Sequence, residues 1–231
     1  MNDILVQPTD AATTVAASLA DILAARVRPV AAGASEAEFL RDLGHPDVVL
    51  GVAALDGGGW PIVEGSAKPV VLVPHSLRLG ADVIKRVLVP LDGTEEAAHA
   101  VAEAVCLFRA AGTEIIVLHV FDRATVPACW DQPAHARSAW EEEFLARHCV
   151  PFFDGPPPLV TLRSGHPGEN VVQVAEDAAD LIILGWSRRL LPGRAQTVRT
   201  AIAGACVPVM LVPTHAPAQQ TSWVTRQGAA V

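Results

Sequence analysis

Short apolar runs alternate with amphipathic stretches along the second half of the chain, and this alternation constrains the fold more than any other feature. Runs such as Leu181–Leu184 are apolar at consecutive positions, which is typical of parallel strands covered by helices on both faces. The preceding stretch, about 168–179, places Val171, Val174 and Ala178 at helical spacing. The five runs lie at 87–91, 114–120, 159–163, 181–184 and 207–212. This order predicts an α/β fold with an open parallel sheet and helices on both faces.

The first half repeats the pattern in a shortened form. Matching strands are Ile4–Val6 with Val87–Val89, Arg28–Gly33 with Val160–Gly165, Asp47–Gly51 with Asp180–Gly185, and Pro69–Pro74 with Pro208–Pro213, with helices expected at about 11–26 and 35–43. The offset between matched strands rises from 83 residues at Ile4 to 132 at Arg28, so about 49 residues are missing, the length of one strand, one helix and their loops. The predicted boundaries are a truncated α/β domain at 1–77, a linker at 78–85, a complete α/β domain at 86–213 and a flexible tail at 214–231.

Charge and composition exclude several classes of protein. The net charge of −8, with only two lysines, argues against nucleic-acid binding as the main activity. The chain has no apolar stretch of about 18 residues that would predict a membrane span, and its first ten residues do not resemble a secretory signal. Four cysteines without a C-x-x-C pair indicate reduced thiols, so a cytoplasmic protein is expected.

Five segments of the second half, in this order and spacing, resemble the universal stress protein family. Arg86–Thr94 is similar to the opening of such domains, and Leu118–Val120 to the end of their second strand. Gly165–Pro167 followed by Asp180–Gly185 is similar to their fourth-strand region, and Val207–Pro213 to their final strand. The resemblance covers 86–213 in full and 4–74 in part.

This resemblance implies a five-stranded sheet of order 3-2-1-4-5, with a crevice at the carboxyl ends of strands 1 and 4. Asp92, Val120 and Gly185 end the first, second and fourth strands and should meet there. In ATP-binding members of the family, the strand-1 aspartate contacts adenosine, and a loop of the form G-x2-G-x9-G-[S/T] wraps the phosphates. The cofactor implied is therefore ATP or a related adenine nucleotide, with no metal beyond nucleotide-associated Mg²⁺.

The phosphate loop of this chain departs from that form. Gly185 is present, but Arg188 stands at the second glycine, the final Gly-Ser pair falls on Ala195 and Gln196, and the loop is about three residues short. Either nucleotide binding is lost, or arginine side chains and Thr197 replace the backbone cradle. The candidate cofactor-binding residues are Asp92, Gly93, Val120, Gly185, Ser187, Arg188, Gly193, Arg194, Gln196 and Thr197.

The first copy is a poorer candidate for binding. Thr9 stands where Asp92 stands in the second copy, and the glycine run before Trp60 is more typical of a flexible turn than of an anion cradle. A structural role is expected instead. Relatives pair through their final strands, which implies either a homodimer or an intramolecular pseudo-dimer, alongside an unknown protein partner.

Other clusters give little support for catalysis or metal binding. The spacing of Cys129, His135, His148 and Cys149 fits no common zinc pattern. His119 at a strand end is more typical of a satisfied core histidine than of a crevice donor. Without a clear acid/base pair, at most slow ATP hydrolysis is expected. Two functions stay open: an adenine-nucleotide-binding stress regulator, or a dimerisation and protein-interaction scaffold that has lost the nucleotide.

Overall fold

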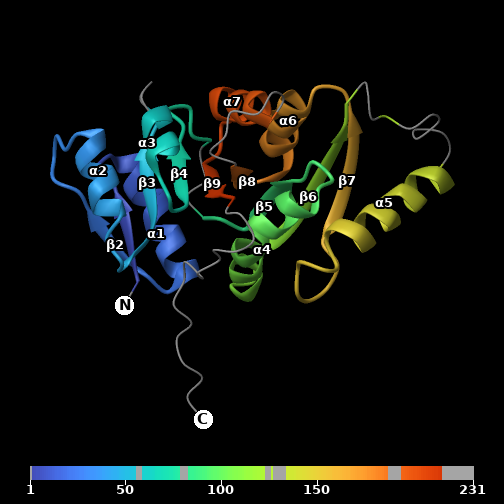
Figure 1. The fold of residues 1–231 in the computed structure, drawn as a ribbon, viewed down its shortest axis with the longest axis horizontal. Coiled ribbons are helices and arrows are strands. Elements are labelled where there is room, and N and C mark those ends of the chain that lie inside the picture. Colours follow the sequence, from blue (N-terminus) through green and yellow to red (C-terminus); the bar gives the residue numbers. More distant parts are fainter. Residues whose placement is uncertain are drawn as a thin grey trace, which may run out of the picture.

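The computed structural model describes residues 2–55, 59–78, 83–122, 126, 134–186 and 194–214. All strands in these residues belong to one sheet. The nine strands run in the order β2-β1-β3-β4-β9-β8-β5-β6-β7 (Figure 1). Their bounds are β1 Asp3–Val6, β2 Arg26–Pro29, β3 Val48–Ala54, β4 Val70–Val73, β5 Arg86–Pro90, β6 Glu114–Phe121, β7 Leu159–Ser164, β8 Leu181–Trp186 and β9 Val209–Pro213. All neighbouring pairs in it are parallel except β4 with β9.

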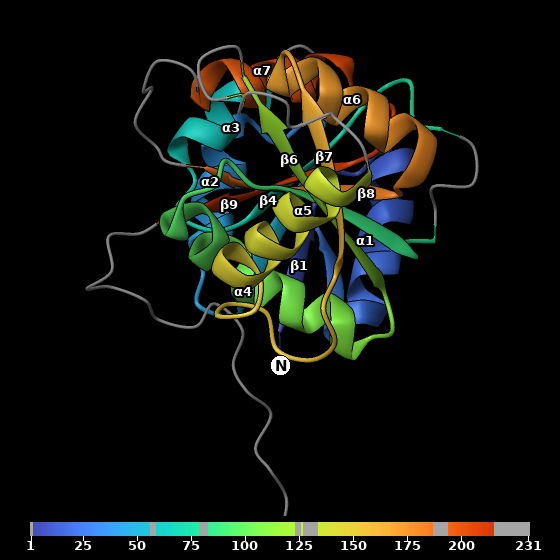
Figure 2. The same ribbon diagram turned by 90° about the vertical axis from the view of Figure 1, so that its right-hand side faces the viewer.

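Helices cover both faces of the sheet, as Figures 1 and 2 show. The bounds are α1 Asp10–Leu23, α2 Glu36–Leu43, α3 Gly59–Gly65, α4 Glu95–Ala110, α5 Ala134–His148, α6 Pro167–Ala178 and α7 Arg194–Gly204. Residues of α1, α4 and α5 pack into one core cluster, and residues of α2, α3, α6 and α7 into another. Successive strand residues alternate between the two cores, as Val87 and Leu88 do. The prediction of an open, mostly parallel α/β sheet is confirmed.

The five strands of the second half have the relative order 3-2-1-4-5, but they do not form a separate sheet. At β9 the sheet continues into β4 of the first half, with Val70 opposite Leu211 and Leu72 opposite Val209 in antiparallel register. Each of these two strands therefore has a hydrogen-bonded neighbour on both sides. The sheet has nine strands and not the five expected for the second half, because apolar runs predict strands but not which strand edges pair with each other.

The first half differs from its sequence match at two points. The helix expected to about residue 26 ends at Leu23, where Ala24 takes a left-handed conformation with φ of 48°. In addition, β2 pairs with β1, placing Ile4 opposite Val27, as β6 pairs with β5. Thus β2 has the same position in the first half that β6 has in the second half. The sequence comparison had matched β2 with the segment that forms β7. The predicted repeat and domain boundaries stay predictions.

Arg78, at the start of the predicted linker, is bonded to the second half of the chain. Its guanidinium donates to the carbonyls of Glu176 and Ala179 at the end of α6, both at 2.7 Å, and to the Asp180 carboxylate at 2.9 Å. The other Asp180 oxygen accepts from the backbone N–H of Arg86 at 2.9 Å. This network fixes the entry into β5. Residues 79–82 of the linker and 215–231 of the tail lie outside the described residues.

Among the described residues, no helix is long and apolar enough to span a bilayer.

Candidate functional site

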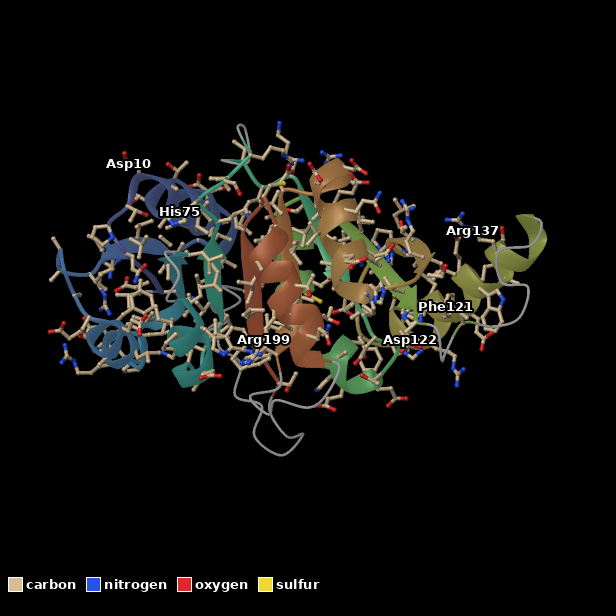
Figure 3. The ribbon with its side chains drawn as sticks, turned by 90° about the horizontal axis from the view of Figure 1, so that it is seen from above. Asp10, His75, Phe121, Asp122, Arg137 and Arg199 are labelled. Carbon is tan, nitrogen blue, oxygen red and sulfur yellow. The ribbon has the colours of Figure 1, made fainter. Side chains whose placement is uncertain are left out.

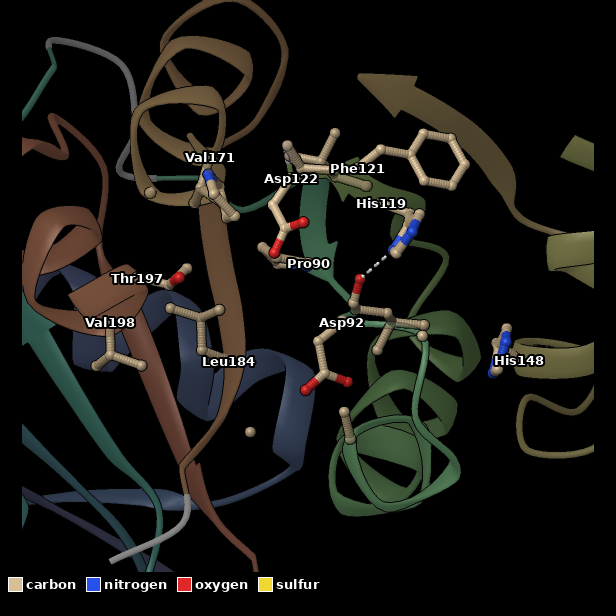
Figure 4. Close-up of a pocket in the computed structure, with 18 of the residues that line it drawn as sticks. Pro90, Asp92, His119, Phe121, Asp122, His148, Val171, Leu184, Thr197 and Val198 are labelled. Atoms are coloured by element: carbon tan, nitrogen blue, oxygen red, sulfur yellow. Dashed lines mark hydrogen bonds between the residues drawn. The ribbon is translucent and has the colours of Figure 1, made fainter. Parts of the chain in front are cut away.

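A cavity opens where β5 and β8 separate. Their parallel pairing consists of Val87 opposite Leu181 and Leu88 opposite Ile182, and it stops well before either strand ends. The helices that follow the two strands, α4 and α7, lie on opposite faces of the sheet, so the chain diverges at this point. The result is a cavity of about 830 Å³ at the carboxyl ends of the strands (Figure 4).

The turn after β5 brings Asp92 to the cavity wall. The Asp92 carboxylate accepts from the backbone N–H of Thr94 at 3.0 Å and from its hydroxyl at 2.6 Å. Thr94 in turn caps α4, since its side chain accepts from the N–H of Ala97 at 3.2 Å. Between them, Gly93 has φ of +82°, and a Cβ there would lie 3.3 Å from Cε1 of His119. The turn therefore needs glycine at this position.

Aromatic rings from β6 and α5 form a second wall, which we call the aromatic wall: His119, Phe121, Trp140, Phe144 and His148. His119 stacks on Phe144 with centroids 4.6 Å apart and meets Phe121 edge-on at 4.7 Å. His148 lies 4.8 Å from Phe144, and Trp140 lies 6.1 Å from Phe121. These contacts make one continuous apolar surface along one side of the cavity.

Both histidines of the aromatic wall have a pKa below the ordinary value. Desolvation lowers the pKa of His119 most, although its bond to the Leu91 carbonyl and nearby acids partly oppose that effect. Because a carbonyl only accepts, His119 donates its Nδ1 proton to Leu91 at 2.9 Å, which leaves Nε2 as an acceptor. Burial also lowers the pKa of His148. His119 thus has the satisfied bond expected of it and lines the cavity as well.

The opposite wall is built from the beginnings of α6 and α7. Pro167, Gly168 and Glu169 line the cavity from the first, and Gln196 to Val198 from the second. The first turn of a helix has backbone N–H groups without intrahelical partners, so both ends favour an acceptor or an anion. The helices pack closely here, because a Cβ on Gly168 would lie only 2.6 Å from Cβ of Thr200.

Carboxylates outnumber cations on the described walls. The acidic residues are Asp92, Asp122, Glu143 and Glu169, whereas Arg147 is the single arginine or lysine among the described lining residues. Arg147 pairs with Glu143 at 3.1 Å, one helical turn away. The described part of the cavity therefore has an acidic character.

Among the described residues, hydrogen bonds close the corresponding crevice of the first half, between β1 and β3. Pairing of β1 with β3 continues to Val6 opposite Val52, and the N–H of Gln7 then donates to the Val52 carbonyl at 3.0 Å. The Gln7 side-chain oxygen also accepts from the N–H of Ala54 at 2.9 Å. Thr9 caps α1 through Ala12 N–H, as Thr94 caps α4, so the match of Thr9 with Asp92 is wrong. The glycine run leads into α3, which begins at Gly59.

Comparison with known proteins agrees with this geometry. The family model of the universal stress protein family matches residues 84–213, more than half of the chain. The chain belongs to the universal stress protein family. No curated protein matches it.

The likeness to solved structures with the same fold extends over nearly all of the chain. A universal stress protein from Archaeoglobus fulgidus is 18% identical, with a TM-score of 0.57 over 93% of this chain and 86% of that chain. A Pseudomonas aeruginosa protein of unknown function is 14% identical, with a TM-score of 0.60 over 92% of this chain and 82% of that chain. At these identities the likeness shows a shared fold. It means that this universal stress protein fold includes residues outside the family match.

The structure brings six of the ten predicted site residues together at the cavity: Asp92, Gly93, Val120, Gly185, Gln196 and Thr197. Ser187, Arg188 and Gly193 lie outside the described residues, and Arg194 begins α7 with its side chain outside them. The aromatic wall was missed as a site feature. Trp140 and Phe144, four residues apart, indicate one helix face, but that spacing does not say what the face contacts.

The spacing of the candidate cysteines and histidines argued against a zinc site. Among the described residues, no group of three His, Cys, Asp or Glu side chains is placed to hold a metal. Cys129 and the side chain of His135 lie outside them. Burial raises the pKa of the Cys149 thiol to about 12, so it stays protonated at neutral pH.

Proposed function

We propose that this universal stress protein is a regulatory module that binds an adenine nucleotide in the cavity between β5 and β8. The observation that carries the proposal is the position of Asp92. This aspartate, which family resemblance assigns to the adenosine moiety, lies in the wall of a cavity at the point where the sheet changes winding direction. Figure 4 shows its carboxylate within that cavity.

The size and walls of the cavity suit a nucleoside. A volume of about 830 Å³ falls in the range of roughly 300–1,000 Å³ that small-molecule sites occupy. Val171, Leu184 and Val198 supply apolar surface on another side of the cavity, and the aromatic wall extends the cavity toward α5. A planar base finds apolar neighbours there, while the carboxylate of Asp92 can accept hydrogen bonds from ribose hydroxyls.

Phosphate groups meet a less favourable environment. Four carboxylates line the described walls, and the arginine among those residues already pairs with Glu143. The helix N-terminus at Gln196 and Thr197 favours an anion, but a triphosphate would also need cations from Arg188, Arg189 or Arg194. The nucleoside part is therefore proposed to contribute most of the affinity.

A protein-interaction scaffold without nucleotide is the second candidate. The acidic walls favour it, because they oppose the charge of the phosphates that family members hold. In both cases we propose that the two halves of the chain form a pseudo-dimer, because β4 and β9 pair with each other along the edges that would otherwise be free. Such an arrangement predicts a monomer of 24.3 kDa in solution, unless a different surface of the chain forms an oligomer.

Native mass spectrometry and thermal unfolding test both candidates. Adenosine, AMP and Mg²⁺–ATP at about 100 times Kd should stabilise the protein by about 2.7 kcal/mol, or roughly 5–10 °C in Tm. Asp92→Ala should abolish the shift, whereas Asp177→Ala on the exposed side of α6 should retain it. Exchange of Arg188, Arg189 and Arg194 for Gln should weaken ATP binding more than adenosine binding. The absence of any shift up to millimolar concentrations would support the scaffold instead.

A further inference from the structure

Trp186, the last residue of β8, forms part of the cavity wall and is almost fully enclosed. Its exposed fraction is 2%. Its carbonyl accepts from the N–H of Thr214 at 2.8 Å and from the Thr214 hydroxyl at 3.3 Å, so the ends of β8 and β9 are tied together. The position of this ring helps to set the shape of the cavity.

The ring that contacts Trp186 comes from the first half of the chain. Trp60, in α3, meets Trp186 edge-on, with centroids 5.3 Å apart and planes at 68°. The guanidinium of Arg199 lies 5.1 Å from the centroid of the Trp60 ring, and Figure 3 labels Arg199 on α7. One side chain of α3 therefore contacts two elements of the cavity wall, β8 and α7.

The support behind Trp60 is closely packed. A Cβ on Gly59 would lie 3.1 Å from the side chain of Leu72 in β4, and Ile62 and Val63 are buried. The Trp60 indole N–H donates to Glu64 one helical turn away at 2.6 Å. Helix α3 is thus held against the strand that joins the two halves, so its position is tied to the sheet.

We propose that Trp60 is a positioning residue for the cavity of the other half. By contacting Trp186 and Arg199, it keeps the end of β8 and the first turns of α7 in register, and so fixes Gln196, Thr197 and Val198. Removal of its ring leaves a gap beside Trp186 and removes the cation–π contact of Arg199. The effect on ligand affinity rests on the proposed function, whereas the effect on the wall itself does not.

Hydrogen exchange of the ligand-free protein tests the structural part. In Trp60→Ala, amide exchange should rise in peptides covering 196–202 and at Thr214, whose N–H bonds to Trp186. Trp60→Phe keeps a ring at this place and should restore most of the protection. Val63→Ala is the matched control, because it also removes buried side-chain volume from α3 but has no ring contact with Trp186 or Arg199.

Adenosine titration of the same variants tests the link to binding. Trp60→Ala should weaken adenosine binding roughly 3- to 30-fold, the range of typical couplings through packed residues, with Trp60→Phe intermediate and Val63→Ala near wild type. Unchanged exchange in Trp60→Ala would overturn the inference. Increased exchange in Trp60→Ala, combined with no adenosine binding by the wild-type protein, would refute the nucleotide proposal and leave the positioning role in place. Binding that is equal in all variants would refute the link to affinity.

Discussion

In each half of this sheet the first strand lies beside a later strand, and among the described residues hydrogen bonds close this crevice in the first half while a cavity opens in the second. Between β1 and β3, hydrogen bonds continue to the strand ends, and Gln7 bridges onward to Ala54. Between β5 and β8, pairing stops at Leu88 and a cavity of about 830 Å³ follows. The winding of the chain places a crevice, but the point at which the strands stop pairing decides whether it opens.

The length of the turn after the first strand accounts for part of this difference. Gln7, Pro8 and Thr9 lead from Val6 to the cap of α1, whereas the longer segment Pro90–Thr94 leads from Val89 to the cap of α4. The two extra residues supply Asp92 and the left-handed Gly93. The shorter turn of the first half has no residue at the position of Asp92.

The largest effect is expected at Gly168, where α6 and α7 border the open crevice. In Gly168→Ala the new Cβ meets Cβ of Thr200 at 2.6 Å, so the helices must move apart, and we expect a loss of about 1–3 kcal/mol in unfolding free energy. Thermal or urea unfolding measures it, and adenosine binding should weaken. Gly185→Ala is the stability control, since its Cβ would find neighbours at 3.4 Å or more. Equal stability of the two variants would show that close helix packing does not maintain this wall.

A smaller effect is expected at the closed crevice. Gln7→Ala leaves the N–H of Ala54 without its acceptor, which should reduce unfolding free energy by about 1–2 kcal/mol, or roughly 2–8 °C in Tm. Gln7→Glu retains an oxygen at the same place and should stay close to wild type at pH 7. If Gln7→Ala melts like wild type, the side-chain bridge is not what stabilises the closed state.

The smallest effect concerns pH and arises in the aromatic wall of the open crevice. Burial lowers the pKa of His119 below its ordinary 6.5, so the unfolded chain binds more protons than the folded one as pH falls below that value. Stability should therefore decrease between pH 7.5 and pH 5.5. His119→Gln should show a shallower decrease in Tm over this interval, and the lowered pKa of His148 contributes to the decrease that remains. An identical pH dependence in the variant would exclude His119 as a source.

Sequence predicted most strands and helices correctly because their signals are local. Apolar runs such as Val70–Val73 and the cap at Thr94 depend on neighbouring residues alone. The end of α1 could not be predicted in this way, since Ala24 adopts a left-handed conformation without the glycine that usually marks it. The β4–β9 pairing was also beyond prediction as a specific register, because it joins distant segments.

For the site, sequence identified the residues that follow strands and the beginning of α7, and it missed the aromatic wall contributed by β6 and α5. Asp92 and Gly185 were found because a strand end has a defined place in this topology. Trp140 and Phe144 belong to α5, whose position depends on tertiary packing and not on its own periodicity. Gly93 was predicted as a binding residue. Sequence could not show why glycine is needed there, because the close approach of the His119 ring depends on the three-dimensional structure.

The antiparallel contact of β4 with β9 has a consequence for synthesis. Val70 pairs with Leu211, which follows it by 141 residues, so at about 5–20 residues per second β4 waits roughly 7–28 s for its partner. During that interval the first four strands present an apolar strand with unpaired N–H and C=O groups. Two nascent chains on one messenger could pair through this edge. Slow translation between residues 74 and 208 should therefore increase aggregation more than slow translation after residue 213.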